Sequence, residues 1–161
     1  MKTRVETLID SLHLQPHPEG GFYGEVFRSK LDVTPADGRT VRQALTAIHF
    51  LLAAGQVSRW HRVLSDEAWS HLEGDPLELR VFDAALGHLT IVRLGRFSPE
   101  EQPLHVVPAG HWQAARPLGT YALVGCFVGP GFDFGDFSLA ADVPQVTEAI
   151  LALGGDGAQL I

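Results

Sequence analysis

The sequence predicts an all-β fold, a sandwich or barrel of short strands with a helix near each end. Two observations support this prediction. Apolar or alternating segments recur along the chain at close spacing, with turn residues between them. The composition includes 17 Gly and 10 Pro, which favours many turns and therefore short strands. The length of 161 residues and the 45% hydrophobic content suit a single domain, residues 1–161, with an ordinary core.

The expected strands lie within a barrel core of about residues 18–139. The segment 77–82 alternates cleanly, with Leu77, Leu79 and Val81 on one face. The segment 43–53 is almost wholly apolar and long enough for a buried helix, but the short turn after it favours a strand in a hairpin. The full set of expected strands is 21–29, 43–53, 57–63, 67–73, 77–82, 88–94, 104–107, 111–115 and 120–128.

Each end of the chain carries a helix signal. Thr3 and Glu6 form a capping box at the start of a helix expected over residues 3–12. A second helix is expected over residues 144–153, with a proline in its first turn and a Gly-Gly pair after it. The tail from residue 156 to residue 161 is expected to be loose.

Charge and composition exclude several classes of function. The net charge of −7 leaves no basic footprint for nucleic acid or an anionic membrane. The one cysteine, Cys126, cannot form an intrachain disulfide, and its apolar surroundings in sequence predict a buried small hydrophobe. We find no apolar signal segment at the start and no apolar run of about 18 residues, so a cytoplasmic protein is expected.

A first candidate site lies in the stretch 58–74, SRWHRVLSDEAWSHLEG. If residues 67–73 form a strand, Glu67, Trp69 and His71 share one face. An acid, an indole and an imidazole together suit the lining of a pocket, and the alternative is a solvated face of an antiparallel sheet.

A second candidate stretch covers residues 106–113. Its Pro108-Ala-Gly110 sequence reads as a tight turn, because Pro fixes φ and Gly accepts positive φ. After the turn, His111 and Gln113 share one face of the next strand. By contrast, His17 lies between two prolines and is expected on the surface of a loop.

These two stretches resemble the two motifs of the cupin superfamily. The positions that fit are Gly55, His61, Glu67, Gly74, Pro108 and Gly110. Two usual histidine positions hold other residues, Val63 and Gln113. The chain resembles in particular the cupin family called DUF985. The segments that carry this resemblance are Pro18-Glu-Gly-Gly-Phe-Tyr23, Thr46–Leu52, Asp66-Glu-x-Trp69, Pro108-Ala-Gly-x-Trp-Gln113 and Gly129–Phe137.

The resemblance implies a jelly-roll barrel, a double-stranded β-helix, that is usually paired as a homodimer. It implies a pocket inside the barrel for a small polar ligand, with a carbohydrate or a nucleotide sugar as candidates. Four functions stay open: a binding protein, a metal-independent isomerase or epimerase, a metal-dependent enzyme, and a dimeric structural or interaction protein with a vestigial pocket.

The roles of individual residues follow from the same resemblance. In the epimerase hypothesis His61 is the base, Glu67 orients it, and Tyr23 is a candidate acid by residue type. In the metal hypothesis His61 and Glu67 remain as ligands of a divalent metal; Val63 cannot bind one, and the amide oxygen of Gln113 is a poor ligand.

Strand alternation and the pairing implied by the family together predict one site. We expect Glu67 to be paired with His61, directly or through water, because an unpaired buried carboxylate is costly. The ligand-binding set in this prediction adds Tyr23, and the residues expected to converge in the pocket are His61, Glu67, Trp69, His71, His111 and Gln113.

Overall fold

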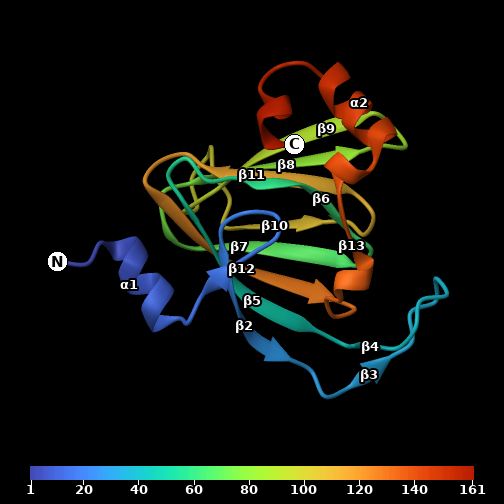
Figure 1. Ribbon diagram of the computed structural model, residues 1–161, viewed down its shortest axis with the longest axis horizontal. Helices are drawn as coiled ribbons and strands as arrows, with labels where there is room; N and C mark the ends of the chain where they lie inside the picture. Colours follow the sequence, from blue (N-terminus) through green and yellow to red (C-terminus); the bar gives the residue numbers. More distant parts are fainter.

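A computed structural model describes residues 1–161, and it consists of two antiparallel sheets packed face to face (Figure 1). Sheet A has six strands in the order β1-β2-β5-β12-β7-β10. Their bounds are Gln15–Pro16, Phe22–Arg28, Thr46–Ala53, Tyr121–Gly129, Asp66–Gly74 and Leu104–Val107. Sheet C has five strands in the order β13-β6-β11-β8-β9. Their bounds are Phe137–Leu139, Ser58–Val63, Trp112–Pro117, Leu77–Asp83 and His88–Leu94. The predicted all-β jelly-roll barrel is therefore confirmed.

The core lies between the two sheets. Phe50, Trp69 and Val124 come from sheet A, Leu79 and Ala115 come from sheet C, and all are at most 1% exposed. Alternation along each strand sends every second side chain into this layer. Most of the apolar segment 43–53 forms the interior strand β5, which has strands on both sides of it, β2 and β12. The hairpin expected with the next strand does not form, because β6 belongs to the other sheet.

Two helices cover different parts of the barrel (Figure 1). The helix α1 (Arg4–Ser11) has the predicted capping box at Thr3 and packs Leu8 against Leu51 of β5. The helix α2 (Pro144–Ala152) covers the outer face of sheet C, where Ile150 joins a second apolar cluster. No helix in the structure has the length and apolar character needed to cross a membrane.

The tail is packed, so the prediction that it is loose is wrong. The short helix η3 (Gly157–Leu160) buries Leu160, which is 1% exposed. The indole of Trp60 donates to the Gly157 carbonyl over 3.0 Å. Asp156 pairs with Arg80 and Arg116 on the neighbouring strands. Sequence reasoning missed these contacts because each joins residues that are far apart along the chain.

An ion cluster holds the segment after β12 against the small hairpin of β3 (Asp32–Val33) and β4 (Arg42–Gln43). Asp136, in the short helix η1 (Phe134–Asp136), is 3% exposed and accepts from both Arg39 and Arg42 over 2.8 Å. Arg39 also donates to the Ser65 hydroxyl over 3.0 Å. This cluster keeps Phe134 and its neighbours over one end of the barrel.

Candidate functional site

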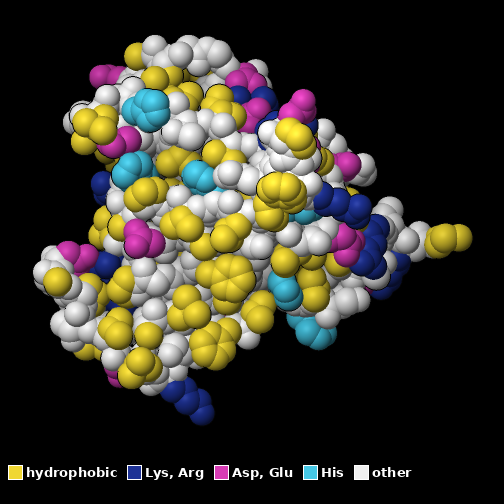
Figure 2. Space-filling model, turned by 180° about the vertical axis from the view of Figure 1, so that it is seen from behind, with side chains coloured by type: hydrophobic (Ala, Val, Ile, Leu, Met, Phe, Trp, Pro, Cys, Tyr) yellow, Lys and Arg dark blue, Asp and Glu magenta, His cyan; other side chains and the backbone are white.

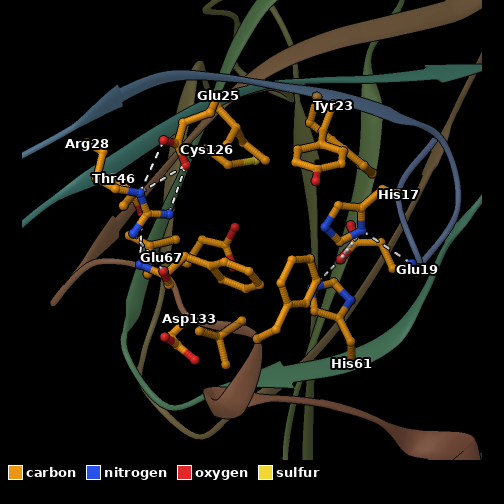
Figure 3. A pocket seen from close by; sticks show the side chains of 16 residues that line it. His17, Glu19, Tyr23, Glu25, Arg28, Thr46, His61, Glu67, Cys126 and Asp133 are labelled. Carbon is orange, nitrogen blue, oxygen red and sulfur yellow. Dashed lines mark hydrogen bonds and ion pairs between the residues drawn. The ribbon is translucent and has the colours of Figure 1, made fainter. Parts of the chain in front are cut away.

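A cavity lies between the sheets at the end covered by residues 132–134. It has a volume of about 210 Å³. Strands β2, β5, β7 and β12 of sheet A and β6 of sheet C line it. Figure 3 shows the lining side chains arranged in a ring, with Glu67 on one side and His17, Glu19 and His61 on the opposite side.

The Glu19 side chain is fixed in the cavity wall by a tight turn. Gly20 and Gly21 have φ of 113° and 70°, values that favour glycine. A Cβ at Gly20 would lie 2.1 Å from the Val57 carbonyl oxygen, so no other residue fits there. The turn brings the Glu19 carboxyl within 2.8 Å of the Ser58 hydroxyl, which donates to it.

Glu19 and His61 form a close acid–imidazole pair. The Nδ1 atom of His61 lies 2.8 Å from the Arg59 carbonyl oxygen, which only accepts, so Nδ1 carries a hydrogen. The Nε2 atom lies 3.1 Å from Oε2 of Glu19. Burial raises the pKa of Glu19 to about 8 and lowers the pKa of His61. Both shifts favour the neutral pair, in which the Glu19 carboxyl is protonated and Nε2 of His61 is not.

His17 completes this side of the cavity, so the prediction that it lies on the surface is wrong. Its side chain is 6% exposed, and its Nδ1 atom accepts from the Glu19 backbone N–H over 3.2 Å. The Tyr23 ring meets its imidazole edge to face at 4.7 Å. Burial lowers the pKa of His17 to about 4, with the nearby His61 adding to the effect.

Glu67 faces the cavity from β7 and is bound by Gln113, not by His61. The Nε2 atom of Gln113 donates to Oε2 of Glu67 over 2.5 Å. Burial raises the pKa of Glu67 to about 7, although His61 and Gln113 oppose the rise. The direct pairing of Glu67 with His61 is therefore not formed: Gln113 is the partner of Glu67, Glu19 is the partner of His61, and His61 acts on the pKa of Glu67 by its charge.

Two predicted ligand-binding residues support the site from behind. Trp69 and Gln113 are each 1% exposed, and neither lines the cavity. The Trp69 indole donates to the Gln113 oxygen over 2.9 Å. The prediction that they converge in the pocket with His61 and Glu67 is therefore wrong, because in the series Trp69–Gln113–Glu67 only the Glu67 carboxyl lies at the cavity wall. Tyr23, the further residue of the predicted ligand-binding set, does line the cavity.

His71 and His111 do not reach the cavity either, so of the six residues predicted to converge only His61 and Glu67 line it. A register shift in the pairing of β7 with β12 occurs beside His71, and its Nε2 atom lies 3.1 Å from the Asp75 carbonyl oxygen at the following turn. His111 precedes β11 and lies 3.5 Å from Asp83, at a separate groove. Alternation along a strand does not show how far along the barrel a side chain lies.

Cys126 is buried, as predicted, and it also lines the cavity beside Glu67. Burial raises the pKa of its thiol, and the Glu67 and Glu19 carboxylates add to the effect. The thiol therefore stays protonated, which does not fit a nucleophile.

The residues at this site do not fit the metal that the family resemblance implies. No group of three or more His, Cys, Asp or Glu side chains is arranged to hold a metal ion. Val63 occupies one usual ligand position, and the Gln113 oxygen already accepts from Trp69. His61 and Glu67 thus remain without the third protein ligand of a typical catalytic zinc site.

Sequence reasoning missed His17 and Glu19, the residues that face Glu67. Both belong to the segment before β2. A usable signal was present in Glu19-Gly20-Gly21, because two glycines directly after an acid indicate a turn that packs closely against other backbone.

Comparisons with known proteins agree with this architecture. The family described as Cupin superfamily (DUF985) matches residues 6–140. A hypothetical protein from Leishmania major is 34% identical, with a TM-score of 0.80 over 94% of this chain and 98% of that chain. A protein from Shewanella oneidensis is 36% identical, with a TM-score of 0.79 over 94% of this chain and 90% of that chain.

Two further similarities are weaker evidence about this chain. Oxalate decarboxylase from Bacillus subtilis shares the fold, with a TM-score of 0.59 at 17% identity over 90% of this chain and 35% of that chain. A stretch of 63 residues is 38% identical to isoleucine–tRNA ligase from Halorhodospira halophila. That stretch is 37% of this chain and spans only 6% of the ligase.

Proposed function

Since this chain belongs to the DUF985 family of the cupin superfamily, we propose that its cavity binds a small molecule and transfers protons to and from it. The observation that carries this proposal is the pair of buried acids that face each other across the cavity. Glu67 has a pKa of about 7, and Glu19, whose carboxyl lies 3.1 Å from Nε2 of His61, has a pKa of about 8. General acids and bases work best when their pKa lies near the working pH.

The roles follow from the partners of each group. Glu67 is held as an acceptor by the Gln113 amide, so its carboxylate is suited to remove a proton. The Glu19–His61 pair holds one proton between Oε2 and Nε2, so it is suited to give one. Because the two groups face each other in Figure 3, a ligand between them can lose a proton on one side and gain one on the other. This arrangement is typical of isomerase chemistry and needs no metal.

Proton exchange into deuterated water tests this function without a known substrate. The protein is incubated in D₂O with a small-molecule extract of cells, and the C–H signals are followed by proton NMR. We expect at least one compound to lose a C–H signal with the wild-type protein and to keep it with Glu67→Gln. Glu19→Gln serves as a second variant, because a glutamine amide still donates to His61 but cannot release a proton to a ligand.

Two results would contradict the proposal. A compound that binds the wild-type protein and returns with all its C–H signals intact would support a binding protein instead. An exchange that continues unchanged in Glu67→Gln would place the chemistry elsewhere.

We further propose that the protein is a homodimer that pairs through the outer face of sheet A. Five large apolar side chains on four strands of this face are 40–53% exposed. They are Phe27, Leu72, Leu104, Val106 and Phe127. Figure 2 shows hydrophobic side chains gathered on the lower half of the molecule, where sheet A lies. An apolar surface that crosses several strands is typical of an interface.

A further inference from the structure

We infer that the ligand of this cavity is an organic cation, a molecule with a protonated amine or a quaternary ammonium group. The inference rests on the proposed function and names the class of ligand that the same cavity takes. It comes from the charges and the aromatic rings of the lining.

Carboxyl groups greatly outnumber cations around the cavity. Glu19, Glu25, Glu67 and Asp133 come from four different segments and all line it. The one lysine or arginine in the lining is Arg28. Its guanidinium already donates to Glu25, to Gln43 and to the Phe132 carbonyl oxygen. A phosphate or carboxylate would therefore meet several acids and no uncommitted cation.

Aromatic rings form much of the rest of the wall. Phe132 and Phe134 lie over the cavity with ring centroids 5.0 Å apart and planes at 83°. Phe50 of β5 and Tyr23 of β2 line the cavity from sheet A. The faces of aromatic rings attract cations, and combining rings with carboxylates is the usual way proteins recognise ammonium groups.

Binding of a cation should also release protons. Glu19 and Glu67 are held partly or fully protonated at neutral pH by burial. A positive charge beside them favours their charged forms and lowers each pKa. The affinity for a cation should thus increase from pH 6 to pH 8.5. A nucleotide sugar, whose diphosphate is anionic, is the ligand that this lining favours least.

The test compares probes of equal shape and different charge by calorimetry at pH 8.5 and low salt. The pairs are benzylamine with benzyl alcohol and benzoate, and choline with its neutral isostere 3,3-dimethylbutan-1-ol. We expect at least one cation to bind at least about tenfold more tightly than its neutral partner, with no detectable binding of benzoate. Titration in two buffers of different ionisation enthalpy should show proton release.

A matched pair of variants places the effect in the cavity. Asp133→Asn removes one lining charge, and asparagine can still cap η1 as Asp133 does. Asp142→Asn removes the same charge from an exposed position outside the cavity lining. We expect the first to weaken cation binding several-fold and the second to leave it unchanged.

The inference is overturned if the neutral probes bind as well as the cations, if benzoate binds best, or if no cation binds at about 10 mM, a concentration at which even weak sites fill. Its failure is distinct from failure of the proposed function. If a neutral compound exchanges its protons in a manner that depends on Glu67, the inference that the ligand is a cation is wrong and the proton-transfer function is still supported.

Discussion

The indole N–H of Trp69 donates to the side-chain oxygen of Gln113 over 2.9 Å, and this contact decides which end of Gln113 faces Glu67. An indole only donates, so the amide oxygen turns toward it and the NH₂ group turns toward the carboxyl. Glu67 consequently meets a donor at 2.5 Å, which favours its charged form and opposes the effect of burial. A core residue that touches no ligand thereby orients the group at the cavity wall.

Replacing Trp69 by phenylalanine should disturb Glu67 as well as stability. Trp69→Phe leaves the Gln113 oxygen without its donor, which costs about 1–3 kcal/mol of unfolding free energy. The amide is then free to turn its oxygen toward Glu67, so the pKa of Glu67 should rise above its value of about 7. Urea denaturation and carboxyl titration by NMR measure the two effects. Trp60→Phe is the control, since it loses a donor to the Gly157 carbonyl and should leave Glu67 unchanged.

The two buried acids should make the protein less stable as the pH rises. Their pKa values of about 8 and 7 in the folded chain exceed the value of about 4.3 in an unfolded chain. The folded state therefore binds more protons, and stability falls from about pH 4.5 to pH 8. Glu67→Gln should remove a penalty of about 1–3 kcal/mol at pH 9, seen as a smaller drop in Tm between pH 6.5 and pH 9. An equal drop in the variant would contradict the assignment.

His17 should have the opposite effect on stability, which should rise with pH in the range below pH 6.5. Its pKa of about 4 lies below the value of about 6.5 in an unfolded chain. The unfolded state gains the proton first, so this contribution to stability is lost as the pH falls from about 6.5 to 4. For this reason the acids are best measured above pH 6.5.

Arg39 offers a direct comparison of a buried and an exposed ion pair. It contacts Asp136, whose side chain is 3% exposed, and Asp37, whose side chain is 51% exposed. Asp136→Asn should cost about 3–5 kcal/mol, because it leaves Arg39 and Arg42 without a buried counter-charge. Asp37→Asn should cost less than about 1 kcal/mol. Equal losses for the two variants in urea denaturation would show that Asp136 does not anchor the segment over the cavity.

A charge on the outer face of sheet A should separate the proposed dimer. Phe127→Lys places a cation at the centre of the apolar face, so light scattering should report the monomer mass of 17.5 kDa with an unchanged circular dichroism spectrum. Leu86→Lys, at an 80% exposed turn position, should leave the dimer intact. A wild-type protein that is already monomeric at micromolar concentration would disprove the proposal.

The packing of the tail makes a separate prediction. Leu160→Ala removes a side chain that is 1% exposed and should cost about 2–4 kcal/mol. Leu153→Ala, at a position that is 36% exposed, should cost less than half of that. If both variants unfold at the same urea concentration as the wild type, η3 does not contribute to the core.

The sequence by itself determined the fold class, the positions of the longer strands along the chain and the capping box at Thr3. These features depend on local chemistry: the alternation of residues 77–82, the Pro108-Ala-Gly110 turn, and the bond between Thr3 and Glu6. It also identified Glu67 and His61 as residues of interest, because both lie in one short stretch that resembles the family motif. Each of these patterns can be recognised within a window of a few consecutive residues.

Only the tertiary structure decided which groups meet. Glu19 reaches His61 from a turn 42 positions earlier in the chain, and Gln113 reaches Glu67 from 46 positions later. His71 keeps its place in the strand but lies beside a register shift, next to the turn at Asp75. The same burial that brings these groups together raises the pKa of Glu19 and Glu67. The loss of hydration that raises the pKa of a carboxyl depends on every segment packed around it, so this loss cannot be predicted from any single stretch of sequence.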